Sequence, residues 1–292
     1  KNMLSELLSR VISKQVSRKG AEMPLLKRFS EIRIMDSTEF GVSNKAKDQF
    51  KGYGGLGREA IAQVQLEYEL KAGKVTMLSI GSAIDSDAIL GMKNIDSIPA
   101  KTLLIRDVAY FSPKNFAQLQ SKGLYFVSRH KPQWSLFVKK DGVHLEPLAL
   151  KEIEQELRSQ NRKYMELEVW VGDIYKVPLR LIANLLTPDQ AQKRLDKKRR
   201  SGAQISQLSK DSACLNMFLT NLDLDVTADE IYQLYRLRWQ IELVFKTWKS
   251  VFRLHLTHSM NPCRLECLIL VKLIWIMLNW TILKFIEEKI KK

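Results

Sequence analysis

The sequence predicts a mixed α/β protein whose sheet-forming core is interrupted by a β-rich insertion. Over the first part of the chain, apolar runs and helical spacings alternate in the order strand, strand, strand, helix, strand, helix, strand, which favours a mixed sheet. From Pro132 the pattern changes to short strands between charged stretches. With 45% hydrophobic and 27% charged residues the composition is that of a globular protein, so a disordered or low-complexity chain is excluded.

The elements before the insertion follow from local patterns. Residues 31–38 alternate like a strand and end in the polar cluster Asp36-Ser37-Thr38. Residues 61–70 and 75–83 have the composition of strands and flank the turn 71–74, which predicts a hairpin. A short helix over 86–92, an apolar strand over 101–107 that ends at Asp107, a helix over 113–122 and a strand over 124–128 complete this part.

The insertion is expected over residues 132–220. Strands are predicted over 134–138, 164–171 and 177–186. Residues 193–200, KRLDKKRR, hold six basic residues and one acidic residue on a helix or a loop. Two interpretations have equal weight: a solvated surface face, or a segment that contacts phosphates.

A long helix is predicted over residues 228–252, with Thr227 as its cap. At about 100° per residue, its polar residues form one stripe along the border of the apolar face, where they could line a cleft. The stripe consists of Tyr235, Arg238, Glu242, Lys246 and Lys249. The alternative is an exposed helix with ion pairs, since Arg238 and Glu242 are four residues apart, and periodicity alone favours it.

Charge and cysteine content indicate the kind of partner and compartment. The 47 Lys and Arg residues exceed the 32 Asp and Glu residues by 15, which favours a polyanion such as nucleic acid or an anionic membrane surface. Three cysteines are too few for a disulfide framework and indicate a reducing compartment. The apolar run 268–286 is interrupted by Lys272, Asn279 and Lys284, so we expect a buried helix rather than a membrane span.

Three carboxylates stand out as candidate metal ligands. Asp36 and Asp107 end predicted strands, and Glu242 lies on the predicted helix. Carboxylate oxygens suit Mg²⁺ or Mn²⁺, and a two-metal site can activate a water and stabilise the leaving oxygen of a phosphodiester. For either Asp alone, a turn or a helix cap is the commoner role.

The sequence around these carboxylates resembles a known family. Residues 235–249, YRLRWQIELVFKTWK, are similar to the Tyr-Arg-Glu-Lys signature of one group of bacterial insertion-sequence transposases of the DDE type (insertion-sequence family four). Residues 35–38, MDST, and 104–110, LIRDVAY, resemble the family's segments around its two Asp residues, with Ala109 where Gly is usual. The blocks 126–129, 218–221 and 261–266 are also similar, so the resemblance extends from about Glu31 to the C-terminal helix.

The resemblance implies a ribonuclease-H-like core with the insertion between the second Asp and the Glu. It implies DNA transposition, with Asp36, Asp107 and Glu242 holding two Mg²⁺ or Mn²⁺ ions while the ends of the element are cleaved and joined to target DNA. Tyr235, Arg238 and Lys249 would grip phosphates next to the scissile bond. We add Lys246, from the same stripe, and Arg129, at a strand end, as DNA-contact candidates; a salt bridge is an equal alternative for Arg129.

The resemblance also sets expectations about partners, location and domains. The partners would be double-stranded DNA of the terminal inverted repeats and of the target, bound by a dimer in the synaptic complex, with no membrane. The location would be the bacterial cytoplasm at the nucleoid. The expected domains are a basic amphipathic helix over 1–30 as the remnant of a DNA-binding region, the first part of the core over 31–131, the insertion over 132–220, and the rest of the core over 221–292.

Two departures qualify the resemblance. Family members that form a DNA hairpin offer a Trp just before the strand that corresponds to 218–220, where this chain has 214–217, CLNM. Trp134 and Trp170 could substitute, although packing is the favoured role of both. Asp36 lies close to the first residue, Lys1, so we expect that most of the domain that reads terminal repeats is missing.

Three further alternatives stay open. The chain could be an inactive or truncated basic DNA-binding relative of a transposase, or a membrane-associated protein. His255, His258, Cys263 and Cys267 have zinc-like spacing, but the apolar residues between them favour packing.

Overall fold

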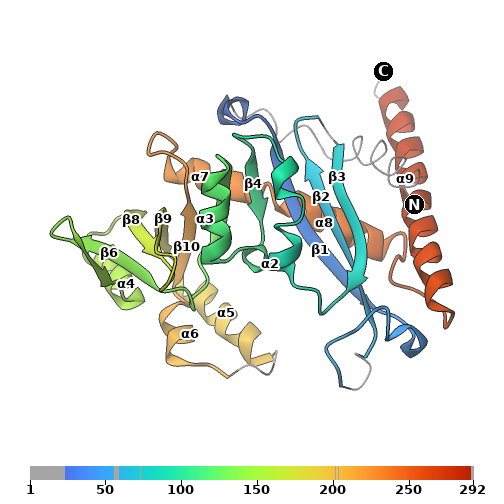
Figure 1. Cartoon of the computed structure of the whole chain (residues 1–292), viewed down its shortest axis with the longest axis horizontal. Helices are drawn as coiled ribbons and strands as arrows, with labels where there is room; N and C mark the ends of the chain where they lie inside the picture. Colours follow the sequence, from blue (N-terminus) through green and yellow to red (C-terminus); the bar gives the residue numbers. More distant parts are fainter. Residues whose placement is uncertain (1–23, 56–58, 73, 201, 203, 291–292) are drawn as a thin grey trace. The chain divides into compact units, whose positions relative to one another are not determined.

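The computed structural model describes residues 24–290 except 56–58, 73, 201 and 203 (Figure 1). The chain divides into two compact units, one of residues 1–106 with 236–292 and one of residues 107–235. Most of the helix predicted over 1–30 lies outside the described residues. The described part begins with a 3₁₀ helix, η2 (Pro24–Arg28).

The first unit is built on a sheet of four strands in the order β3-β2-β1-β4 (Figure 1). β1 pairs with β2 antiparallel and with β4 parallel, and β2 and β3 form the predicted hairpin. Parallel and antiparallel pairs in one sheet confirm the mixed α/β prediction. The strands and helices of this unit are β1 (Ile32–Gly41), η3 (Asn44–Ala46), β2 (Ile61–Glu69), β3 (Lys74–Ser82), α2 (Asp87–Leu90), η4 (Ile95–Ser97), β4 (Leu103–Arg106), α8 (Trp239–Ser250) and α9 (Pro262–Ile290).

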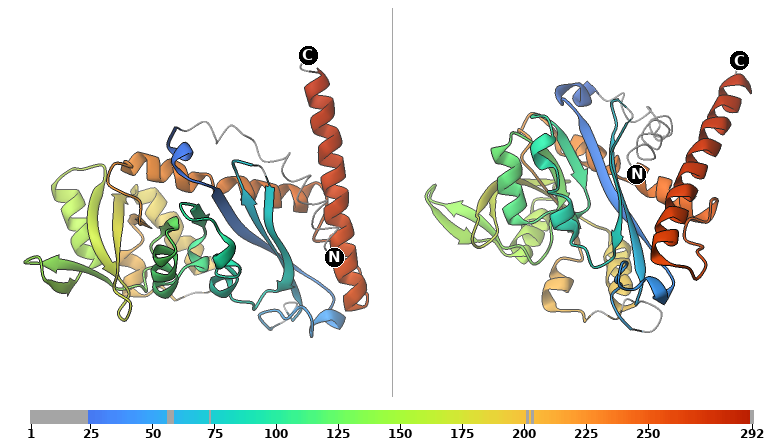
Figure 2. Two further views of the ribbon diagram at one scale, coloured as in Figure 1. Left: turned by 45° about the horizontal axis from the view of Figure 1, so that its top comes forward. Right: turned by 45° about the vertical axis from the view of Figure 1, so that its right-hand side comes forward.

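Helix α8 packs against β1 and so brings its polar residues close to that strand (Figure 2). Its buried residues are Ile241, Phe245 and Trp248, at positions i, i+4 and i+7, which is the spacing of one helical face. Trp248 is 1% exposed and lies edge-on to Phe245, with ring centroids 5.4 Å apart. The apolar face therefore fixes the rotation of α8 about its axis.

The side chains that the structure describes in the C-terminal helix α9, those of residues 262–276, 278 and 279, are buried on one face only, so the prediction of a buried helix was wrong for the other face of this part. Leu265, Ile269 and Leu273 are fully buried, whereas Val271 and Trp275 are mostly exposed. Apolar residues occur all round this helix, and a sequence pattern without a polar face does not tell which side the rest of the protein covers. In the described part of the chain, no helix meets the length and hydropathy required to cross a membrane.

The second unit carries an antiparallel arrangement of six strands in the order β5-β10-β9-β8-β6-β7. Helix α3 packs against β5 and β9, and helix α4 packs against β9. The elements of this unit are η5 (Val108–Tyr110), α3 (Pro113–Ser121), β5 (Tyr125–Arg129), β6 (Leu136–Lys140), β7 (His144–Pro147), α4 (Leu150–Ser159), β8 (Met165–Val171), β9 (Val177–Leu185), α5 (Pro188–Arg200), α6 (Gln207–Asp211), β10 (Leu215–Thr220) and α7 (Ala228–Arg236).

The sequence prediction omitted β7 and α4. Helix α4 did carry a signal, because Leu150, Ile153 and Leu157 are buried at helical spacing. The basic run 193–200, predicted as helix or loop, belongs to helix α5.

The single helix predicted over 228–252 is wrong: α7 ends at Arg236 and α8 begins at Trp239. Between them, the amide of Gln240 donates to the carbonyl of Leu237 and the amide of Ile241 donates to that of Arg238. These bonds span three residues instead of four and tighten the turn. The segment contains neither Gly nor Pro, so the sequence offered no stop signal.

Candidate active site

Asp36 lies on β1 and is held by a backbone contact at one oxygen. Its Oδ1 accepts a hydrogen bond of 2.9 Å from the amide of Ser37. The alternation of the strand directs Ser37 to the opposite face, where its hydroxyl accepts from Gln63 on β2. The side chain of Asp36 is 16% exposed, so it is only partly shielded from solvent.

Arg238 joins Asp36 to Glu242. Its Nη1 donates to Asp36 Oδ2 over 2.8 Å, and its Nη2 lies 2.5 Å from Glu242 Oε1. The guanidinium is 14% exposed and Glu242 is 31% exposed. The predicted ion pair between Arg238 and Glu242 is therefore present, but it is not a solvated pair on an outer face. It belongs to a triad that contains a strand carboxylate 202 residues away from Arg238 in sequence.

Asp107 is positioned by the parallel pairing of β1 and β4. In that register Met35 is the partner of Arg106, Asp36 is the next residue of β1, and Asp107 is the first residue after β4. Asp107 also caps η5, because its Oδ1 accepts a hydrogen bond of 3.2 Å from the amide of Ala109. The capping role considered from sequence is thus present.

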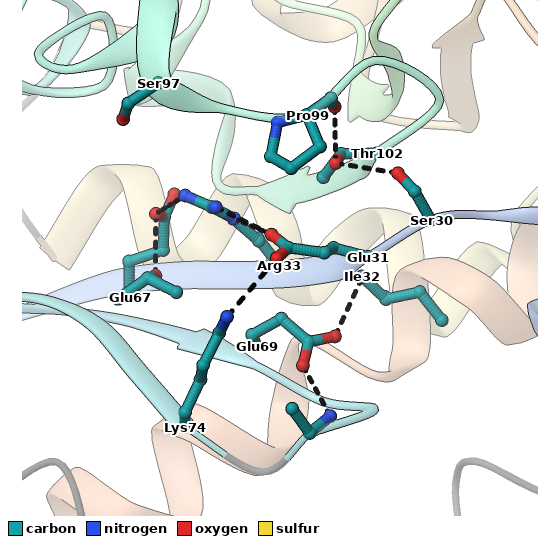
Figure 3. A network of polar contacts seen from close by, with 12 residues as sticks. Ser30, Glu31, Ile32, Arg33, Glu67, Glu69, Lys74, Ser97, Pro99 and Thr102 are labelled. Carbon is teal, nitrogen blue, oxygen red and sulfur yellow. Dashed lines mark hydrogen bonds and ion pairs between the residues drawn. The ribbon is translucent and has the colours of Figure 1, made fainter.

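A buried ion-pair network supports the strand segment just before the two Asp residues, and sequence reasoning missed it. Glu67 on β2 accepts from Arg33 over 3.2 Å (Figure 3). It also accepts from Arg106 over 2.6 Å and from Thr76 over 2.9 Å. Arg33 also pairs with Glu31. Burial alone would raise the pKa of Glu67, but the charges of Arg106 and Arg33 outweigh burial and hold that pKa below its ordinary value.

This network fixes the ends of the strands that carry the candidate carboxylates. The side chains of Arg106 and Glu67 are 2% and 6% exposed. Arg106 also donates to the carbonyl of Gly91. A buried pair with several hydrogen bonds resists displacement, because moving either partner leaves a charge without compensation. Alternating polar residues on β2, at positions 63, 65, 67 and 69, were the signal that could have indicated it.

The two lysines of the predicted stripe have different environments. Lys249 is half-buried, and its Nζ donates over 2.7 Å to the carbonyl of Glu39 on β1. Burial lowers its pKa, and the nearby charge of Glu39 opposes this effect. Lys246 is exposed. Lys249 thus ties the end of α8 to the strand that carries Asp36, while Lys246 extends into solvent.

Tyr235 and Arg129 meet in the second unit. Tyr235 is the second-last residue of α7, is 7% exposed, and packs edge-on against Phe218 with ring centroids 4.8 Å apart. The guanidinium of Arg129 lies 5.5 Å from the centre of the Tyr235 ring, within the range of a cation–π contact. A stripe on one helix that includes Tyr235 together with Glu242 is therefore wrong, because these residues lie on separate helices.

Neither tryptophan considered for DNA contact stands free on the surface. Trp134 lies edge-on to Phe116 at 5.4 Å, and the ammonium of Lys139 lies 4.8 Å from the ring of Trp170. These packing contacts agree with the role that the sequence favoured for both.

Within the described residues, no group of three or more His, Cys, Asp or Glu side chains is gathered closely enough to hold a metal ion. This finding applies to the His and Cys residues with zinc-like spacing over 255–267, which do not form a metal site. It applies equally to Asp36, Asp107 and Glu242, which are not close enough together to form such a group. Asp36 and Glu242 are each paired with Arg238 instead.

Comparison with known proteins identifies the family. The family model described as a transposase DDE domain matches residues 27–278. The chain belongs to the family of DDE transposase domains. The transposase for insertion sequence element IS231F of Bacillus thuringiensis subsp. israelensis is 32% identical over 95% of this chain and 61% of its own length. The transposase for IS231B of Bacillus thuringiensis subsp. berliner is 30% identical over 85% of this chain and 55% of its own length.

A more distant relative agrees. The transposase for IS1151 of Clostridium perfringens is 28% identical over 89% of this chain and 59% of its own length. This DDE domain therefore spans between 55% and 61% of the length of these curated relatives.

Proposed function

We propose that this DDE domain cleaves DNA at the ends of an insertion sequence and joins those ends to target DNA. The observation that carries the proposal is the triad in which Arg238 contacts both Asp36 and Glu242, together with the β1–β4 register that puts Asp107 one residue beyond the Met35–Arg106 pair. Acidic groups with a fixed cation beside them suit phosphoryl transfer, which depends on positioning and on neutralising phosphate charge.

Asp36, Asp107 and Glu242 are the residues that would hold two Mg²⁺ or Mn²⁺ ions. Their donor set fits such ions, since all three groups are carboxylates and both Asp36 and Glu242 are partly exposed. When bound, such ions would activate the attacking water or hydroxyl and would stabilise the leaving oxygen. The chain contributes the strands β1 and β4 that position the two Asp residues, the helix α8 that carries Glu242, and the guanidinium of Arg238 beside Asp36 and Glu242.

The cations near the carboxylates would contact the DNA backbone. Lys249 lies on the same helix as Glu242, Arg238 is the N-cap residue of that helix, and Lys246 extends from it into solvent. Arg129 and Tyr235 offer a second contact in the other unit, where a guanidinium covers an aromatic ring. Phosphate contacts of this kind position a strand without reading its sequence.

We also propose a ribonuclease-H-like core, with the insertion between Asp107 and Glu242, and a dimer on paired element ends. The parallel β1–β4 pair beside the antiparallel β1–β2–β3 segment supports the core assignment. Residues 132–220 fall within the second compact unit, which supports an insertion. A second candidate function, DNA binding without catalysis, is disfavoured because all three carboxylates are present.

The test is cleavage of a labelled duplex that carries the element's terminal repeats. We expect cleavage to require Mg²⁺ or Mn²⁺ and to be lost in Asp36→Ala, Asp107→Ala and Glu242→Ala, while all three variants still bind the duplex. Glu39→Gln is the matched control, because Glu39 is a nearby β1 carboxylate that accepts from Tyr53 and stands outside the trio. Cleavage that persists in Glu242→Ala would overturn the assignment of the site.

A further inference from the structure

A basic hollow of about 190 Å³ lies entirely within the second unit, away from the candidate carboxylates in sequence. It is formed where the end of β5, the start of β10 and the helix α5 meet. Its polar lining includes Arg129, Arg194, Lys198, Ser209 and Asn216. The hollow is smaller than the roughly 300–1,000 Å³ of pockets that enclose drug-sized molecules, so its size fits one small group.

Three basic side chains, Arg129, Arg194 and Lys198, line the hollow. Among the described residues that line it there is no Asp or Glu. Burial lowers the pKa of Arg194, and the positive charge of Arg129 lowers it further, which shows that two like charges act on each other there. Cations held close together in a partly buried place favour an anionic ligand.

The cations are held in place by the protein. Arg194 donates to the carbonyl of Leu215 over 2.7 Å and to Asn216 Oδ1 over 3.3 Å. Lys198 lies one turn later on α5 and donates to Ser209 Oγ over 2.9 Å. A pre-arranged set of donors loses less conformational freedom on binding than freely moving side chains do.

The remaining basic residues of α5 differ from these two. Lys193 and Lys197 are exposed and do not line the hollow, whereas Arg194 and Lys198 are half-buried and do. His130 also lines it, but burial lowers its pKa to about 4 and outweighs the hydrogen bond to the Trp134 carbonyl, so the ring is neutral near pH 7. The positive charge of the lining therefore comes from Arg129, Arg194 and Lys198.

We propose that this hollow binds one phosphodiester group of a DNA strand, with Arg129, Arg194 and Lys198 as its donors. The inference rests on the proposed function in one respect, that DNA is the substrate. A phosphodiester matches the site in charge and size, and guanidinium groups donate to phosphate oxygens in a fixed fork geometry. Two of the six basic residues in the run 193–200 thus have a binding role, and the other four form a solvated face.

The experiment compares two neighbouring lysines of one helix in the full chain. Lys198→Gln removes a charge from the hollow, and Lys197→Gln removes the same charge outside it. Binding to a short labelled DNA duplex is measured by fluorescence anisotropy between low and high salt. For Lys198→Gln we expect the slope of log affinity against log salt to fall by about 0.9, which corresponds to about eightfold weaker binding at about 0.1 M salt.

Lys197→Gln should keep the wild-type slope, and Lys198→Arg should restore both slope and affinity. Unchanged thermal unfolding midpoints in all three variants show that folding is intact. Equal slopes for Lys198→Gln and Lys197→Gln would overturn the proposal, because they would mean that α5 acts only through its net charge. A failure of Lys198→Arg to restore binding would overturn it as well.

The outcome separates this site from the proposed function. If wild type cleaves element ends but the two lysine variants bind alike, the hollow is no phosphate site and the transposase assignment stands. If wild type binds DNA with the expected dependence on Lys198 but cleaves none with any divalent cation, the proposed function fails and the hollow remains. If wild type binds no DNA, both fail.

Discussion

Replacing Glu67 by Gln tests whether the buried network holds together the strands that carry the candidate carboxylates. The change keeps the shape of the side chain and removes its charge. Arg106, 2% exposed, would then face a neutral amide, and Arg33 would lose one of its two carboxylate partners. Breaking a buried ion pair by removing one charge costs about 3–5 kcal/mol, because the other charge stays buried without compensation.

This magnitude can be set against an exposed pair of the same kind. Arg158 and Glu154 form a 2.8 Å pair on α4 in which the arginine is 60% exposed. Surface pairs with this spacing contribute about 0.3–0.5 kcal/mol. Glu154→Gln is therefore the matched control, and the two variants should differ in their free energy of unfolding by about 3 kcal/mol.

Urea unfolding followed by far-ultraviolet circular dichroism measures both variants. With a denaturant slope of about 3 kcal/mol per M, Glu67→Gln should lower the midpoint by about 1 M and Glu154→Gln should leave it nearly unchanged. A shift for Glu67→Gln no larger than that for Glu154→Gln would refute the reasoning, because the buried charges would then be compensated in another way.

The same variant has a predicted pH dependence. The pKa of Glu67 is lower in the folded protein than in the unfolded chain, where it is about 4.3. The stabilisation of the fold by the Glu67 charge is therefore fully present above about pH 4.3 and is lost as the pH falls through the folded-state pKa. The difference in stability between wild type and Glu67→Gln should stay constant from neutral pH to about pH 5. Below about pH 4 it should shrink. A difference that grows on acidification would contradict the sign of the shift.

Three further predictions concern other parts of the chain. The pKa of His130 is about 4 in the folded state and about 6.5 in the unfolded chain, so the stabilisation that comes from burying the neutral ring is lost as the pH falls from 6.5 to 4. Nuclear magnetic resonance should show the His130 ring titrating near pH 4, and a midpoint near 6.5 would refute this prediction. Thr220→Val removes a hydroxyl that donates to the Phe126 carbonyl and accepts from the Leu222 amide, and should cost about 1–3 kcal/mol in urea unfolding; a change below about 0.5 kcal/mol would show that water replaces both bonds. Arg238→Ala should reduce the salt dependence of binding to an element-end duplex by about one phosphate contact, whereas an unchanged slope would restrict Arg238 to its contacts with Asp36 and Glu242.

Much of the fold and the family could be read from the sequence because the signals are local. The hairpin of β2 and β3, strand β1 and helix α3 follow from alternation, turn residues and helical spacing over a few residues each. The family likewise follows from short motifs around Asp36, Asp107 and Glu242, and the match over residues 27–278 confirms it. Residue type and spacing are properties of the chain itself, so they need no tertiary information.

The break between α7 and α8 depended on packing. Without Gly or Pro near Leu237, propensity favours one continuous helix over 228–252. In the structure Tyr235 packs on Phe218 in the second unit while Ile241 and Trp248 pack in the first. Burial in two different cores overrides local preference, and a helical count across the break cannot place Tyr235 correctly.

The partners of charged side chains were also decided by tertiary structure. The sequence by itself determined which cations and carboxylates exist, their net excess of 15, and the motifs that carry them. Only the folded chain placed Arg238 between Asp36 and Glu242, buried Arg106 against Glu67, and separated Lys198 from Lys197 on α5. The physical reason is that the strength of an ionic interaction depends on distance and burial, and residues far apart in sequence acquire both only when strands and helices pack.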